Sequence, residues 1–314
     1  MGRRDAKLVG KLDSMHIIVP LLYPGRCDNE AFISERIDLT AINEYLKRKN
    51  EELAAGAEAK TAAGPQAEAG APAGAAGSED AADAAPFKYT IFHLVVTAMM
   101  RTLYQRPKMN WFIQNGRIYE RNEVTSSFVI KKKFSDHGAE ALAFIRAEKD
   151  DDIDAIHEKI RAQVYSGRSD KLDGSTEAMN IVSRLPFFLV RFIVWLVRKL
   201  DLHGKVPAPL ISSDPYYTSV VLSNLGSIRL KSGYHHLTNW GTNSIIVIIG
   251  EKKIRPFFEE DGSYEMRDSL ELGITIDERI ADGYYYSKTI RLVKKLLENP
   301  ELLEQPMTEA VDYD

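Results

Sequence analysis

The chain has 314 residues, of which 44% are hydrophobic and 27% are charged, as in ordinary folded proteins, which excludes a fully disordered or fibrous chain. The formal net charge of −4 does not favour nucleic-acid binding, and the single cysteine, Cys27, excludes an intrachain disulfide or a cysteine-based zinc cluster. The sequence shows no signal peptide and no apolar run of 18 residues. We therefore expect a cytoplasmic protein that does not span a membrane.

The part of the chain before residue 55 has the pattern of a strand followed by a helix. Apolar and polar residues alternate over 31–38, which is typical of a half-buried strand. Residues 40–53 then carry apolar side chains at helical spacing, and Asp38 or Thr40 can cap the start of that helix.

Residues 55–86 form a low-complexity segment. It contains 15 alanines, 5 glycines and 3 prolines, and it has no aromatic residue, valine, isoleucine or leucine. Such a segment cannot contribute a core, and its glycines and prolines interrupt any helix. We predict a disordered inserted loop that is dispensable for folding, and one domain built from residues 1–54 and 87–314.

The chain after this loop mixes strands and helices. Asn115-Gly116 lies between two apolar runs and is a strong hairpin signal. The order lacks a strict βαβ rhythm, and neither a G-x-G-x-x-G nor a Walker motif occurs, so we expect an α+β or mixed-sheet α/β fold and not a Rossmann domain. The predicted elements are a helix over 90–104, hairpin strands over 111–113 and 118–119, strands over 124–134 and 141–147, a helix over 151–165, strands over 219–222, 244–249 and 269–276, and a helix from 283 to about 297.

Residues 181–200 are the most apolar segment of the chain. Arg184, Arg191 and Arg198 recur every seven residues, so they share one face of a helix that has Pro186 in its first turns. Two interpretations are open. We favour a helix that is buried in the core or at a subunit contact. The alternative is a helix that lies on a membrane surface or walls an acyl-chain channel.

A C-terminal motif carries a resemblance to a known family. The residues Asp-Glu-Arg-Ile-Ala-Asp-Gly over 277–283 precede the final helix. They resemble the His-x-x-x-Asp-Gly segment of the chloramphenicol acetyltransferase (CAT) family and of the catalytic domain of 2-oxoacid dehydrogenase E2 acyltransferases. Asp282 and Gly283 match this segment, whereas the position of the family's histidine is occupied by Glu278.

Three further stretches resemble the same families in the same order. Residues 32–40 look like their first strand and helix start, and residues 106–110 look like their proline-to-asparagine segment. Val-Leu-Ser-Asn-Leu-Gly over 221–226 resembles the E2 serine motif, which implies that Ser223 donates a hydrogen bond to the tetrahedral oxyanion.

The resemblance implies a CAT-like two-layer sandwich with a mixed sheet and a homotrimer with sites at the interfaces between subunits. It also implies that coenzyme A or acyl-CoA is a substrate, and it allows an acyl-carrier partner. We see no metal-ligand spacing among the histidines, and we expect no lipoyl domain in this chain.

The catalytic base is the open question, because acyl transfer needs a base near the acceptor. Glu278 is a weaker base than histidine, since a free glutamate has a pKa of about 4.3 against about 6.5 for histidine. Burial could restore part of its basicity. Alternatively, Glu278 is a surface residue or pairs with Arg279 of a neighbouring copy.

The adjacent histidines His235 and His236 are the other candidates for the base. If the backbone is extended there, the two side chains point in opposite directions, so at most one faces the site. A loop histidine is more often only hydrogen-bonded to its surroundings. Asp282 likewise has a structural interpretation, because aspartate is a good helix N-cap.

Two classes of function follow from these residues. One is a CoA-dependent acyltransferase with an altered base. The other is a catalytically silent CAT-fold protein that trimerises and binds an acyl-CoA or a protein partner. The fold alone does not choose between them.

Overall fold

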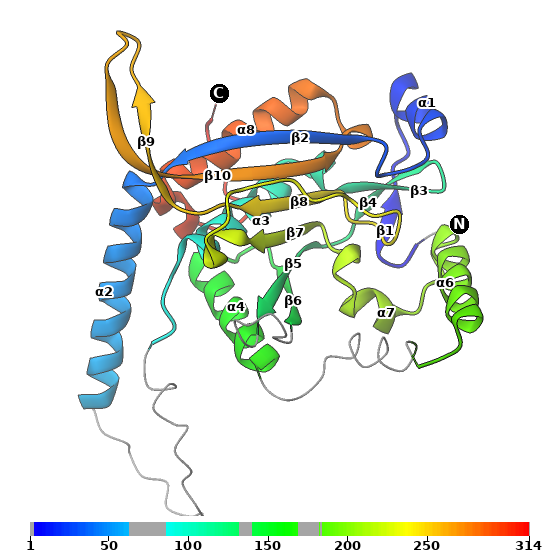
Figure 1. Cartoon of the computed structure of the whole chain (residues 1–314), viewed down its shortest axis with the longest axis horizontal. Coiled ribbons are helices and arrows are strands. Elements are labelled where there is room, and N and C mark those ends of the chain that lie inside the picture. Colours follow the sequence, from blue (N-terminus) through cyan, green and yellow to red (C-terminus); the bar gives the residue numbers. More distant parts are fainter. Residues whose placement is uncertain (1–2, 63–85, 132–139, 169–181, 183, 314) are drawn as a thin grey trace, which may run out of the picture.

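A seven-stranded mixed sheet lies at the centre of the fold in the computed structural model, which describes residues 3–62, 86–131, 140–168, 182 and 184–313. The strand order is β2-β10-β8-β7-β5-β6, and β9 pairs with the outer part of β10 (Figure 1). Strands β5, β7 and β8 run parallel to one another, and the other pairs are antiparallel. The strands are β2 (Glu30–Asp38), β5 (Val124–Lys131), β6 (Glu140–Ala147), β7 (Val220–Asn224), β8 (Ile245–Ile249), β9 (Lys253–Phe258) and β10 (Tyr264–Asp277).

A second, three-stranded sheet of order β1-β4-β3 contains the predicted hairpin. Asn115 and Gly116 both have positive φ, 51° and 66°, as a two-residue hairpin turn requires. The strands are β1 (Ala6–Leu8), β3 (Trp111–Gln114) and β4 (Arg117–Arg121).

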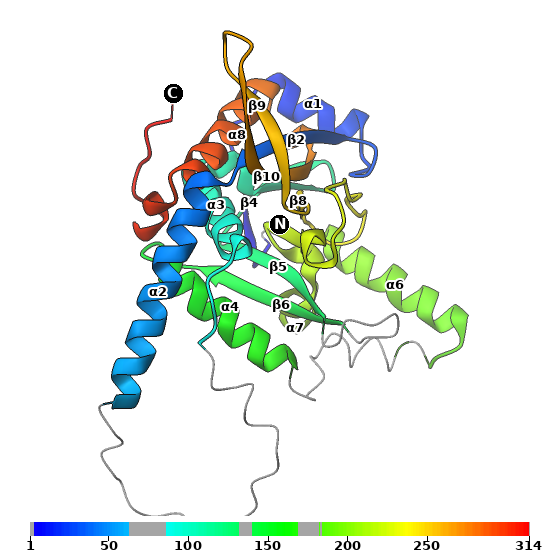
Figure 2. The same cartoon turned by 60° about the vertical axis from the view of Figure 1, so that its left-hand side comes forward.

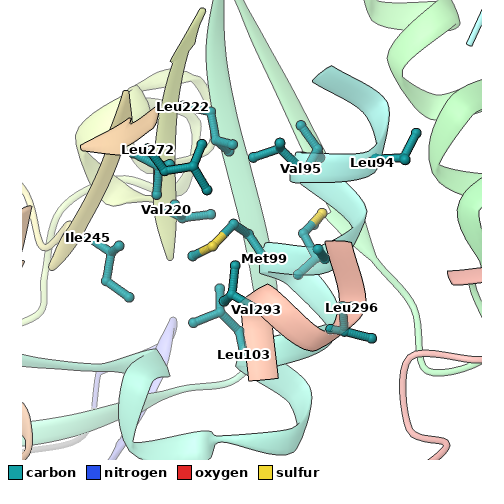
Figure 3. Packing of buried hydrophobic residues seen from close by; sticks show 14 of the residues in the cluster. Leu94, Val95, Met99, Leu103, Val220, Leu222, Ile245, Leu272, Val293 and Leu296 are labelled. Carbon is teal, nitrogen blue, oxygen red and sulfur yellow. The ribbon is translucent and has the colours of Figure 1, made fainter. Parts of the chain in front are cut away.

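Helices cover one face of the large sheet, and the core lies between the two layers. Leu94, Met99 and Leu103 of α3 pack against inward side chains of β7, β8 and β10, together with Val293 and Leu296 of α8 (Figure 3). The mixed-sheet α/β prediction is confirmed. The helices are α1 (Ser14–Leu22), α2 (Thr40–Ala62), α3 (Ile91–Gln105), α4 (Ile153–Arg168), α6 (Phe187–Leu202), α7 (Ala208–Ser213) and α8 (Gly283–Glu298).

The structure changes the expectation for two segments. Helix α2 continues to Ala62, into the start of the segment predicted as a loop, and residues 63–85 lie outside the described residues. A helix forms here, but it begins at Phe187, so that Pro186 precedes it and does not lie in its first turns as predicted. Helix α6 is also not buried in the core, because only Asp201 among its residues is buried. Val190, Ile193, Val197 and Leu200 are half-buried, and most of its other apolar side chains are exposed in the described part of the chain.

Helices α1 and α6 lie at the end of the molecule opposite to α2 and the β9–β10 hairpin (Figure 1). None of the helices in the described part of the chain is long and apolar enough to cross a membrane.

Candidate functional site

Ser223 lies near the end of β7, on the face of the sheet away from the helices. Val220 and Leu222 point into the helix-covered core, so the alternation of the strand puts Val221 and Ser223 on the opposite face. There Ser223 lines a cavity of about 140 Å³ together with His235. The structure thus brings together two of the residues that the sequence singled out.

The turn after Ser223 depends on an asparagine and a glycine. The side chain of Asn224 accepts a hydrogen bond from the backbone N–H of Ser227, at 3.2 Å, and begins a short 3₁₀ turn. A side chain on Gly226 would place its Cβ only 2.5 Å from the carbonyl oxygen of Gly250. Glycine is therefore required for the turn to pack against the end of β8.

The loop over 229–241 crosses this same face of the sheet. A Cβ on Gly273 of β10 would lie 2.0 Å from the carbonyl oxygen of Gly233, so the loop backbone rests directly on the strand. Further along the loop, buried Leu237 packs against Ile246 and Ile248. These contacts fix the two histidines that lie between Gly233 and Leu237.

His235 and His236 lie in different surroundings. His235 lines the Ser223 cavity, and its Nδ1 lies 3.0 Å from the carbonyl oxygen of His236. His236 instead places Nδ1 2.8 Å from Oε2 of Glu30, and its side chain is 81% exposed. At most one of the two can therefore serve Ser223 of its own chain.

Glu30 is a residue of the site that sequence reasoning missed. It is the first residue of β2, and its side chain is only 4% exposed. One carboxylate oxygen contacts His236, and the other accepts a hydrogen bond from the backbone N–H of Leu237. No pattern in the sequence links Glu30 to His236, because 206 positions separate them.

Glu278 follows the last residue of β10 and is exposed. Its backbone N–H donates to the carbonyl oxygen of Asn29, at 2.9 Å. The preceding residue, Asp277, pairs in register with Glu30. Position 278 therefore lies beside the Glu30–His236 pair, and the burial that could strengthen Glu278 as a base is missing within a single chain.

Asp277 and Arg279, on either side of Glu278, form a buried ion pair. Nη2 of Arg279 lies 2.6 Å from Oδ2 of Asp277, and Nε of Arg26 lies 3.7 Å from the same oxygen. Burial lowers the pKa of Arg26, and the charge of Asp277 opposes that effect. Because Arg279 is buried and paired within its own chain, it is not available to a glutamate of another copy.

Asp282 acts as a helix cap. Its side chain accepts a hydrogen bond from the backbone N–H of Tyr285, at 2.8 Å, at the start of α8. The carboxylate is therefore used in the way that its structural interpretation predicted.

Ser223 and Glu278 of one chain are too far apart to act on one reacting centre. Ser223 is in register with Ile248, and Ile248 is in register with Gly273. Glu278 follows five residues later on the same strand, which corresponds to about 17 Å along the strand direction. Groups at these two positions can meet at one substrate only if a second copy of the chain supplies one of them.

Among the described residues, no group of three or more His, Cys, Asp or Glu side chains is placed to hold a metal ion.

Residues 212–304 match the family of 2-oxoacid dehydrogenases acyltransferase (catalytic domain). No curated protein matches the chain in a sequence search.

Several solved structures share the fold. A probable dihydrolipoamide acetyltransferase from Listeria monocytogenes has a TM-score of 0.55 at 13% identity, with 93% of this chain and 94% of that chain covered. A chloramphenicol acetyltransferase has a TM-score of 0.51 at 14% identity, with 93% and 99% covered. A truncated catalytic core of the 2-oxoacid dehydrogenase multienzyme complex from Thermoplasma acidophilum has the same score and identity, with 94% and 99% covered.

These findings confirm the resemblance to the CAT and E2 folds. The matched segment 212–304 contains the serine motif, both histidines and the Asp282-Gly283 pair.

Proposed function

We propose that this chain, whose fold is that of CAT and E2 catalytic domains, is a CoA-dependent acyltransferase with an altered base. The observation that carries the proposal is the shared cavity of Ser223 and His235 within the segment that matches the acyltransferase family. A serine and a histidine that line one cavity can supply the two groups that acyl transfer needs, an oxyanion donor and a base.

The reaction transfers an acyl group from the sulfur of CoA to an acceptor thiol, hydroxyl or amine. A base removes the acceptor proton as the new bond forms to the acyl carbon. The carbonyl oxygen then carries negative charge, which the hydroxyl of Ser223 stabilises by donating a hydrogen bond. When the carbon–sulfur bond breaks, the same base returns the proton to the departing thiolate, so proton and charge balance.

Coenzyme A itself does not fit the cavity of about 140 Å³ beside Ser223, because ligands of that size need several hundred cubic ångströms. The cavity accommodates only the reacting end of an acyl-CoA. We therefore place the rest of the molecule in a channel that a neighbouring copy completes, as in a homotrimer, with an acyl-carrier partner as another possible donor.

Two histidines compete for the role of base, and the structure makes the alternatives distinct. His235 would serve Ser223 of its own chain, because both line one cavity. His236 lies beside position 278, far from Ser223 of its own chain, so it would serve Ser223 of a neighbouring copy. The buried carboxylate of Glu30 would hold the His236 ring in place, as an orienting carboxylate does in a catalytic triad.

Mixing two inactive variants separates these alternatives. If His236 serves the neighbouring copy, Ser223→Ala and His236→Ala each lose activity. A mixed oligomer of the two variants then regains activity, because some interfaces combine an intact serine with an intact histidine. Ser223→Ala mixed with His235→Ala regains nothing if His235 serves its own chain. Refolding the two chains together and measuring CoA release from acetyl-CoA is the assay.

The oxyanion role of Ser223 has its own test. Ser223→Ala lowers the turnover number by about 10²-fold, which is the usual loss for one such donor. Ser212→Ala, in exposed α7, is the matched control and leaves turnover unchanged. A Ser223→Ala variant with full turnover would exclude the proposed oxyanion role.

A second candidate function rests on Glu278, which is exposed and occupies the position of the family's histidine. In this alternative the chain is a catalytically silent binder of acyl-CoA or of a protein. Glu278→His is the decisive variant. CoA release that appears only in Glu278→His supports the silent binder, whereas activity of the natural chain that persists in Glu278→Gln and climbs through about pH 6.5 supports a histidine base.

A further inference from the structure

Helix α6 carries a large apolar surface that no described part of the chain covers. The exposed fractions reach 75% for Phe187, 68% for Phe188, 55% for Phe192 and 53% for Trp195. Helices that are apolar around most of their circumference are normally buried in protein or in lipid. In this structure α6 extends outward from the body of the molecule (Figure 2).

The same surface carries cations without acidic partners. Arg184, Arg191, Arg198 and Lys199 are exposed, and none forms an ion pair with an acid in the described part of the chain. Arg191 and Arg198 are seven residues apart, so they share one face of α6, and Arg184 lies in the turn just before the helix. The exposed part of α6 is therefore both apolar and strongly positive.

The only acidic residue of α6 faces the protein instead. Asp201 is buried, with Oδ1 3.0 Å from Nη2 of Arg3 and Oδ2 2.6 Å from Nε2 of Gln114. These bonds attach the C-terminal end of the helix to the first strand region and to the β3–β4 hairpin. The attachment leaves the aromatic and basic side chains free to contact a partner.

The apolar surface continues toward α1. A groove of about 560 Å³ along α6 and a cavity of about 550 Å³ at its C-terminal end share Arg198 and Leu202 as lining residues. Leu21 of α1 lines that cavity and is 65% exposed, and Ile17 and Leu22 of α1 are exposed by 52% and 66%. Helices α1 and α6 thus both present apolar side chains at this cavity.

We propose that α6, supported by α1, is a docking surface for an anionic lipid bilayer. The aromatic side chains enter the interface between headgroups and acyl chains, while the arginines extend to the headgroup phosphates. With about 24 Å of length, the helix lies along the membrane plane. A second copy of the chain fits this surface less well, because the centre of a protein interface is depleted of charged residues, and α6 presents Arg191, Arg198 and Lys199 without an acidic partner among the described residues.

The test is capture of the purified full chain by vesicles, measured by co-sedimentation. Vesicles of phosphatidylcholine with 30% phosphatidylserine bind the protein, and vesicles of pure phosphatidylcholine bind it at least tenfold more weakly. Arg191→Gln combined with Arg198→Gln weakens binding to the anionic vesicles about 25-fold, since each cation near such a surface contributes about fivefold. Phe188→Glu combined with Trp195→Glu abolishes the binding.

Matched controls lie far from α6. Lys149→Gln combined with Lys295→Gln removes two exposed cations elsewhere and reduces binding less than twofold, and Phe258→Glu removes an exposed aromatic side chain of β9 without effect. If the control variants and the α6 variants lose vesicle affinity equally, binding depends only on net charge and the proposal is wrong.

The oligomeric state distinguishes a second copy from a membrane. Light scattering shows whether Phe188→Glu combined with Trp195→Glu dissociates an oligomer. If it does, and the natural chain does not bind anionic vesicles, α6 is an interface between copies and the proposal is wrong. Acyl transfer is measured separately with soluble acetyl-CoA, so its failure leaves this test unaffected.

Discussion

Helices α3 and α6 are both rich in apolar residues, yet the fold treats them in opposite ways. Eleven of the fifteen residues of α3 are buried, whereas only one of the sixteen residues of α6 is buried. Helix α3 packs on the sheet and contacts α4 and α8 in the same layer, so most of its circumference meets protein (Figure 3). Apolar composition therefore predicts that a helix needs to be buried. Whether residues of the same chain bury it depends on where the helix lies relative to the sheet.

The largest expected difference between the two helices is the cost of shortening a leucine. Leu103 of α3 is 1% exposed and Leu196 of α6 is 41% exposed. Leu103→Ala leaves a cavity in the core and lowers the free energy of unfolding by about 2–5 kcal/mol. Leu196→Ala changes it by no more than about 0.5 kcal/mol. Urea unfolding monitored by circular dichroism measures both, and equal losses would contradict the comparison.

The second difference concerns acid stability. His93 of α3 is buried 4.9 Å, ring to ring, from His157, and burial together with the charge of His157 lowers the pKa of His93 to about 3. The unfolded chain binds a proton at this histidine below about pH 6.5, and the folded chain does not. Stability is therefore fully present above pH 6.5 and falls by about 3 kcal/mol for this residue on acidification to pH 4.5.

His93→Gln removes most of that pH dependence. Glutamine can still accept the hydrogen bond that the backbone N–H of Thr90 donates to Nδ1 of His93, so the start of α3 is kept. His203, at the end of α6, is exposed, and His203→Gln leaves the dependence unchanged. The test is to measure the melting temperature between pH 7 and pH 4.5. If it depends on pH as steeply in His93→Gln as in the natural chain, His93 is not the source of the acid sensitivity.

The smallest expected difference concerns helix ends. The N-cap residue of α8 is Asp282, whose side chain caps the helix, whereas the N-cap residue of α6 is Pro186, which makes no side-chain cap. Asp282→Ala lowers the free energy of unfolding by about 1 kcal/mol, and Asp282→Asn loses much less because asparagine also caps. Pro186→Ala has less than half the effect of Asp282→Ala. An Asp282→Asn variant as unstable as Asp282→Ala would show that the carboxylate charge matters more than the cap.

Much of the fold was predictable because local patterns and tertiary packing agree there. The alternation in β2, the apolar run of α3 and the turn at Asn115-Gly116 each indicate one structure, and each forms. The sequence does not mark β9, because Pro256 lies inside it and it pairs with a polar part of β10 beyond the core. It does not mark α1 either, because a proline, Pro20, lies inside that helix and the outward side of the helix is as apolar as its inward side.

The candidate site was predictable only in part. The serine motif and the two histidines drew attention by residue type, and the cavity brings Ser223 and His235 together as one pair. The role of Glu30 was not predictable, because only the β2–β10 register and the course of the loop over the sheet bring it to His236. Long-range pairing of this kind leaves no trace in local sequence.

The contact between Glu30 and His236 also determines when, during folding, the site is complete. The two residues are separated by 206 positions, so their hydrogen bond closes a long loop of the chain. Bringing such distant residues together costs conformational entropy and slows the formation of the contact. A ribosome must release at least the first 236 of the 314 residues before the ring of His236 can be held in place.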